Sequence, residues 1–308
     1  KGLGRANDEC YLDGGCLAEA LAASLNRFGY AGAIAEMGLG PEPNLLGCPV
    51  EIEGNDVPLV VDTVIGGREE LQKLTVPDPW AGGKMEPVEQ LVASIGGEHA
   101  VLGSVRPPFE YAATVRGLIE FMTDFYRDPE FVRDLVAACA PATLAVGRAL
   151  VEAGVDALVM KDSFASSSMI SPDHYREFAF ESERDAIAEL GAGIPVILHI
   201  CRNSMPILAE MAQTGAAVLE IDAPGHLVAA RAEVRGRGLC SGNIAAGWAP
   251  AGSGAGPGRR GRGGWGREGT GFRDGSRIHF LGCCCSSSRA TSASLSLRLS
   301  VTSLVICG

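Results

Sequence analysis

The chain has 308 residues, of which 46% are hydrophobic, and a formal net charge of −11. This size suits one large α/β barrel or two average domains, and the composition is that of a globular protein. The acidic balance, with no long basic run before residue 258, argues against a nucleic-acid partner. Because we find neither a span of roughly 20 uninterrupted apolar residues nor a secretory signal, we expect a cytoplasmic protein without a membrane partner.

Predicted strands and helices alternate along the chain. Apolar runs rich in β-branched residues predict strands, and segments with apolar residues at helical spacing predict the helices between them. The predicted helices cover residues 17–28, 130–152, 172–190, 204–213 and 227–235, and the predicted strands cover residues 31–37, 100–105, 157–161, 195–200 and 217–221.

This alternation predicts an α/β fold with a parallel sheet. No glycine-rich phosphate-binding fingerprint follows any of the predicted strands, which favours a (β/α)8 TIM barrel over an open, doubly wound sheet. In such a barrel the reactive side chains lie at the carboxyl ends of the strands, because the loops that follow them form the mouth.

The composition changes near residue 245, where Gly, Arg and Ser begin to dominate. We therefore predict a barrel domain over residues 1–245 and an irregular or non-native tail over residues 246–308. A reading-frame shift would explain why the predicted barrel stops after Asn243, incomplete at its C-terminal end. The alternative is a flexible basic tail that binds anions or nucleic acid.

The strongest chemical signal is a predicted strand that ends in His199-Ile200-Cys201. Residues two apart on a strand point to the same side, so the imidazole and the thiol can converge on one point. Zinc binds neutral imidazole and thiolate, and a catalytic zinc site has three protein ligands and one open position. The pair therefore predicts half of a zinc site; the alternative is a packed histidine beside an inert thiol.

Other polar residues also follow predicted strands. Asp222 ends the strand after the His-x-Cys strand and could be a zinc ligand, a hydrogen-bond partner of His199 or a general acid/base. Asp162 and Glu36 are further candidate catalytic carboxylates. The alternatives are a helix cap for Asp162 and a solvated loop acid for Glu36. Ser163 is a candidate substrate-binding residue, as is Asn243.

Several of these segments, in this order, resemble the uroporphyrinogen decarboxylase-like superfamily, and most of all its methylcobalamin:coenzyme M methyltransferase branch. The resemblance spans roughly residues 8–245. The matching stretches are residues 162–166 and 170–178, His199-Ile200-Cys201 with Asn203, residues 206–208, Met211, Gly215, Asp222 and Gly242-Asn243.

The resemblance implies a (β/α)8 barrel that holds zinc through a His-x-Cys pair and a later cysteine. A thiol substrate bound as thiolate then takes a methyl group from a corrinoid, either free or carried by a partner protein. His199 and Cys201 would be ligands, Asp222 stands where the branch has an acidic residue near the metal, and Asn203 would bind substrate.

The chain departs from this pattern at two positions. Arg202 follows Cys201 where the branch usually has glycine. For the later cysteine, the first candidate third ligand is Cys283, which follows a glycine but has different surroundings, and the second is Cys240.

Two further functions stay open. One is uroporphyrinogen decarboxylation in tetrapyrrole biosynthesis, and the other is a catalytically inactive remnant that binds a tetrapyrrole or a corrinoid protein. Decarboxylases of this type need no metal, so the His-x-Cys pair would have no evident use in them. We therefore favour zinc-dependent methyl transfer.

Overall fold

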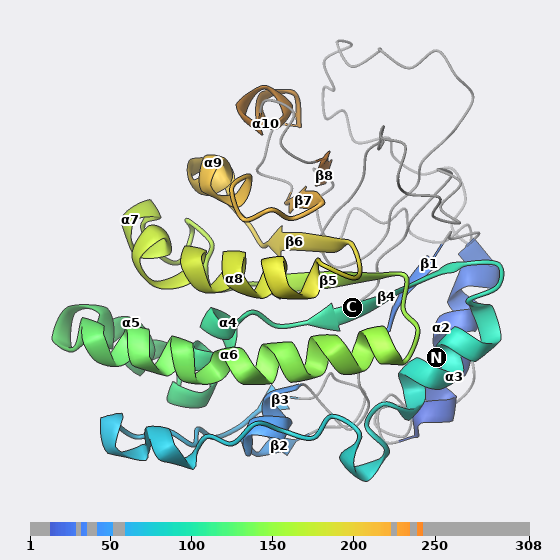
Figure 1. Ribbon diagram of the computed structural model, residues 1–308, viewed down its shortest axis with the longest axis horizontal. Helices are drawn as coiled ribbons and strands as arrows, with labels where there is room; N and C mark the ends of the chain where they lie inside the picture. The colour runs from blue at the N-terminus through green and yellow to red at the C-terminus, as the bar shows by residue number, and fades with distance from the viewer. Residues whose placement is uncertain are drawn as a thin grey trace, which may run out of the picture.

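The computed structural model places a parallel sheet at the centre of the molecule (Figure 1). The residues it describes are 13–28, 32–35, 42–51, 59–222, 227–234 and 239–242.

The sheet has six strands in the order β1-β4-β5-β6-β7-β8, and every neighbouring pair is parallel. The order follows the sequence, without the reversal that marks a doubly wound sheet. The chain therefore winds in one direction, as in a TIM barrel, and the predicted fold class is confirmed. The strands are β1 (Gly32–Ala35), β4 (Ala100–Val105), β5 (Ala157–Asp162), β6 (Val196–Ile200), β7 (Val218–Ile221) and β8 (Leu239–Gly242).

The helices α6 and α8 run side by side along one face of this sheet (Figure 1). The α-helices are α2 (Gly14–Phe28), α3 (Glu86–Ile95), α4 (Pro108–Arg116), α5 (Leu118–Arg127), α6 (Pro129–Glu152), α7 (Pro172–His174), α8 (Phe180–Leu190), α9 (Leu208–Met211) and α10 (Leu227–Val234). The shorter elements are the hairpin β2 (Val50–Glu51) and β3 (Leu59–Val60), and the single turns η1 (Glu42–Leu46), η2 (Arg68–Lys73), η3 (Ala81–Gly83), η4 (Tyr175–Ala179) and η5 (Met205–Ile207).

Local signals start α6 where the sequence predicts it. The Asp128 carboxylate accepts a hydrogen bond from the Phe131 N–H at 2.9 Å, and Pro129 occupies the first turn. The helix predicted over residues 172–190 is present as one continuous helical run, in which the π-helical turn η4 lies between α7 and α8. We did not predict α3, α4, α5 or the β2–β3 hairpin.

Apolar side chains cover both faces of the strands. In β5, Leu158 and Met160 join the large core under the helices, whereas Val159 belongs to a small cluster on the inner face. Burial on both faces explains why these strands read as continuous apolar runs. The inner cluster consists of Ile34, Leu102, Ala157, Val159 and Ile197, with Val218 packed against it.

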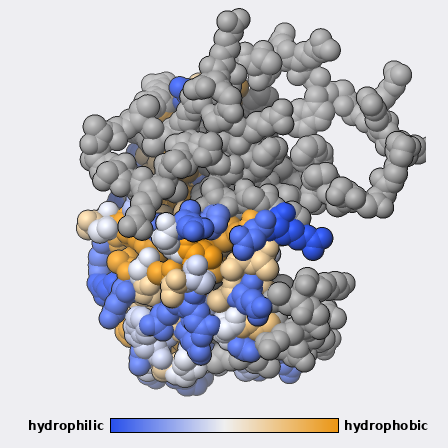
Figure 2. Space-filling model, turned by 90° about the vertical axis from the view of Figure 1, so that its right-hand side faces the viewer, coloured by the Kyte–Doolittle hydropathy of each residue, from blue (hydrophilic) through white to orange (hydrophobic). Residues whose placement is uncertain are grey.

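One described helix, α6, is apolar and long enough to cross a membrane, and half of its most apolar stretch is buried in the fold. It contacts β4, β5, α4 and α8, so packing inside the protein accounts for its composition. On the side that carries α2 and α3, hydrophobic and hydrophilic residues are intermixed (Figure 2).

Candidate functional site

Polar residues replace apolar ones near the carboxyl end of the inner face. Lys161, His199 and Glu220 are direct Cα partners on three neighbouring strands, so they form one row across the sheet. Because side chains alternate along a strand, this row shares its face with the apolar row two residues earlier. That apolar row contains Val159, Ile197 and Val218.

The predicted pair on β6 converges. His199 Nε2 lies 3.1 Å from Cys201 Sγ, within hydrogen-bond distance for sulfur. The imidazole is only 2% exposed, whereas Cys201 is half-buried and is not part of a disulfide. A buried nitrogen therefore faces a thiol that ligands can reach from the mouth of the barrel.

A residue that we did not predict stands behind His199. Glu220 Oε2 lies 3.2 Å from His199 Nδ1, and the Glu220 side chain is 2% exposed. A hydrogen-bond partner of His199 is one of the three roles that we predicted for Asp222, which lies two residues later, just past the end of β7. The alternation that revealed the His-x-Cys pair could also have pointed to Glu220, but only the register shows that it is level with His199.

Ser163 also contacts the Cys201 thiol. Its Oγ is 3.5 Å from Cys201 Sγ, and its backbone N–H donates to the buried Glu110 carboxylate. The loop after β5 therefore brings a hydroxyl to the metal-ligand candidate on β6. This position is compatible with the predicted substrate-binding role of Ser163, which stays a prediction.

Asp222 supports the loop after β6. Its Oδ2 accepts a hydrogen bond from the Arg202 backbone N–H at 2.9 Å. Arg202 has a φ of 60°, which makes it the one non-glycine residue with positive φ in the described part of the chain. Arg202 thus has the backbone conformation that glycine favours, at a position where the related branch usually has glycine.

Asp162 lies on the opposite side of β5 from Lys161, away from the polar row. It is fully buried, and its Oδ1 accepts hydrogen bonds from the backbone N–H groups of Phe164 at 3.0 Å and Ala165 at 2.8 Å. Burial, and then the nearby Glu110 and Glu183 carboxylates, hold the pKa of Asp162 well above its usual range. These contacts support the capping alternative, with the carboxyl group holding the turn.

The remaining predicted residues are less informative. Asn203 joins two loops through its backbone, because its carbonyl oxygen accepts from the Ser167 N–H at 3.0 Å and its own N–H donates to Ser168 Oγ at 3.3 Å. Glu36, Asn243 and Cys283 lie outside the described residues, as does the predicted tail.

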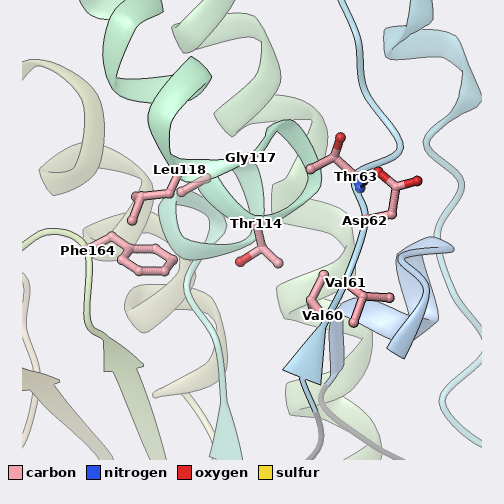
Figure 3. A pocket seen from close by; sticks show the side chains of 9 residues that line it. Val60, Val61, Asp62, Thr63, Thr114, Gly117, Leu118 and Phe164 are labelled. Carbon is pink, nitrogen blue, oxygen red and sulfur yellow. Dashed lines mark hydrogen bonds between the residues drawn. The ribbon is translucent and has the colours of Figure 1, made fainter. Parts of the chain in front are cut away.

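A hollow of about 290 Å³ lies beside the loop that carries Ser163. Figure 3 shows Phe164 and Leu118 on one side of it and Val60 and Val61 on the other. Phe164 lines the hollow and directly follows Ser163, whose hydroxyl contacts the Cys201 thiol. Its walls are mainly apolar, and the other lining residues are Asp62, Thr63, Ala113, Thr114 and Gly117.

The donor set fits part of a zinc site. With Zn–N and Zn–S bonds of about 2.0 and 2.3 Å, tetrahedral geometry separates the two donor atoms by roughly 3.5 Å. The observed separation of 3.1 Å between His199 Nε2 and Cys201 Sγ is slightly shorter than this, and a small side-chain movement would lengthen it to the required value. Among the described residues, no group of three or more His, Cys, Asp or Glu side chains could hold a metal ion, so a third ligand would have to come from elsewhere.

Comparison with known proteins agrees with the fold. A family model described as uroporphyrinogen decarboxylase (URO-D) matches residues 4–248. A methyltransferase from Methanosarcina mazei has a similar structure, with a TM-score of 0.71 and 20% identity over 78% of this chain and 72% of that one. At this identity the likeness shows the fold alone.

The relatives of this chain include proteins of two named activities. The methylcobamide:CoM methyltransferase MtbA of Methanosarcina acetivorans is 26% identical over 221 residues, which cover 70% of this chain and 64% of the relative. A uroporphyrinogen decarboxylase of Nocardia farcinica is 34% identical over 98 residues, or 32% of this chain and 27% of that protein. The chain thus spans less than two thirds of the length of each of these two relatives.

Proposed function

This chain belongs to the uroporphyrinogen decarboxylase family, and on that premise we propose that it is a corrinoid-linked methyltransferase that binds zinc through His199 and Cys201. The methyl acceptor in this proposal is a small thiol, and the donor is a methylated corrinoid, free or carried by a partner protein. The names of relatives such as MtbA, a methylcobamide:CoM methyltransferase, support this chemistry.

One observation carries the proposal: an imidazole nitrogen and a thiol sulfur lie 3.1 Å apart at the carboxyl end of a barrel strand. A simple packing pair would be expected to bury both groups. Here only His199 is buried, whereas Cys201 is partly exposed and directly follows the carboxyl end of β6, the end at which barrel enzymes bind their substrates.

Zinc, when bound, would lower the pKa of a coordinated thiol so that it is available as a nucleophile near neutral pH. The protein would contribute the donor atoms and the orientation. His199 Nε2 and Cys201 Sγ would hold the ion, and Ser163 Oγ lies close enough to Cys201 to contact a ligand placed there. The apolar hollow beside Phe164 would accept the part of the substrate that does not react.

Metal analysis of the purified full chain tests this proposal. We expect about one zinc per chain, lost in His199→Ala and in Cys201→Ser. Demethylation of free methylcobalamin by a panel of thiols, followed through the change in the corrinoid spectrum, then tests the transfer. Zinc that persists in both variants would remove the assigned site.

The predicted third ligand has its own test. If Cys283 completes the site, Cys283→Ser should weaken zinc binding without affecting the folded core, which circular dichroism can monitor. Unchanged zinc binding in this variant would show that another ligand completes the site.

The two alternatives predict different results. A decarboxylase would release carbon dioxide from uroporphyrinogen after treatment with a chelator. An inactive remnant would bind a tetrapyrrole or a corrinoid protein without turnover. Either result, combined with the absence of bound zinc, would replace the proposal.

A further inference from the structure

The inference concerns Glu220, a buried carboxylate that faces His199 from the neighbouring strand. The two residues are direct Cα partners on β6 and β7, their side chains are 3% and 2% exposed, and Nδ1 and Oε2 lie 3.2 Å apart. The separation of 3.2 Å is at the upper end of the range for an N–H···O hydrogen bond.

The surroundings of Glu220 offer its carboxylate few other hydrogen-bond partners. Glu220 Oε1 is buried and has no hydrogen-bond partner among the described residues. A buried carboxylate without partners is costly, so a position like this is stable only when a neighbour donates to it. The imidazole of His199 is close enough to donate this hydrogen bond.

We propose that Glu220 is a positioning residue that accepts the Nδ1 proton of His199 and so directs the Nε2 lone pair toward Cys201. Neutral imidazole carries its proton on one nitrogen, and the hydrogen bond made by one nitrogen sets the role of the other. With the proton on Nδ1, Nε2 is free of hydrogen and can bind a metal ion. Glu220 thus acts through His199.

The geometry separates Glu220 from Asp222. Both carboxylates belong to the same strand end, but Asp222 Oδ2 accepts from the Arg202 backbone and supports a loop. Glu220 is the carboxylate level with His199. Removing a carboxylate that orients a metal-binding histidine commonly lowers metal affinity by about 10–100-fold. This consequence for zinc rests on the proposed function, whereas the tautomer does not.

The first test uses the metal-free full chain and ¹⁵N NMR of the imidazole nitrogens. The chain has five histidines, so the His199 signals are identified by their loss in His199→Ala. We expect the Nδ1–H tautomer in the wild type and a loss of that preference in Glu220→Gln. Glu183→Gln is the matched control, because Glu183 is equally buried but lies on α8. An Nε2–H tautomer in the wild type, or an unchanged tautomer in Glu220→Gln, overturns the inference.

The second test measures zinc affinity by competition with a chelator. We expect about 10–100-fold weaker binding in Glu220→Gln, partial recovery in Glu220→Asp, and wild-type affinity in Glu183→Gln. Equal losses in Glu220→Gln and Glu183→Gln would indicate a general effect of buried substitutions and overturn the inference. If the wild type binds no zinc while the tautomer responds to Glu220, the proposed function fails and the role of Glu220 stands.

Discussion

Arg202 has a backbone conformation that glycine favours. Its φ of 60° is costly for a residue with a Cβ, by about 1–2 kcal/mol in the left-handed region. The backbone still makes the required contact, since its N–H donates to Asp222. The contact with Asp222 therefore helps to hold Arg202 in this backbone conformation.

Arg202→Gly should raise the free energy of unfolding by about 1 kcal/mol, because glycine adopts positive φ without the Cβ clash. Urea denaturation measures this change. Arg202→Ala is the matched control: it also removes the side chain but keeps the Cβ, so it should gain nothing. A glycine variant that is no more stable than the alanine variant would contradict the strain argument.

Phe164 is the residue that connects the hollow to the site, since it follows Ser163 and lines the hollow. Phe164→Ala should raise the KM for thiols with an apolar substituent by about 5- to 150-fold, because about 1–3 kcal/mol of apolar contact is removed. The kcat and the zinc content should change little. Ile119→Ala, at a side chain that is exposed on α5, is the control. Equal KM values for wild type and Phe164→Ala would place the substrate elsewhere.

At the scale of elements, a buried acidic cluster joins β5 to the helices behind it. Tyr175 Oη donates to Glu183 Oε2 at 2.6 Å, across the π-helical turn. Burial raises the pKa of Glu183 to about 8 and holds the pKa of Asp162 well above its usual range. The other charged groups that face this cluster are Glu110 on α4, which pairs with Arg106, and Glu210 near Tyr175.

This cluster predicts a loss of stability as the pH rises. Between the ordinary value of 4.5 and about 8, folded Glu183 keeps a proton that the unfolded chain has released. Unfolding therefore releases protons, and the free energy of unfolding falls through that window. Glu183→Gln removes this contribution, so its stability should depend less steeply on pH. Denaturant melts from pH 5 to 8 measure the slopes, and identical slopes for variant and wild type would contradict the prediction.

At the scale of the whole molecule, zinc binding at the proposed site is coupled to the stability of the folded chain. Zinc at 100 times its dissociation constant should stabilise the folded chain by about 2.7 kcal/mol. The wild-type Tm should therefore rise by several degrees, and the Tm of His199→Ala should not. Differential scanning calorimetry with and without zinc measures this. An equal rise in both proteins would mean that zinc binds at another place.

Much of the barrel could be predicted because the signals are local. Continuous apolar runs located β4, β5, β6 and β7 to within one or two residues, and apolar residues at helical spacing located α6 to within one residue. The helices α4 and α5 were missed because they lie close together, separated by Gly117 alone, and because the buried α4 has no polar face to set its period.

The sequence by itself determined the alternation of strands and helices and the shared side of His199 and Cys201, since a period of two residues is a property of one strand. Only the tertiary structure decided which carboxylate faces His199 and that Asp162 lies behind the sheet. The physical reason is register: the pairing of β6 with β7 sets which residue of one strand is level with a residue of the next. No pattern within a single strand contains that information.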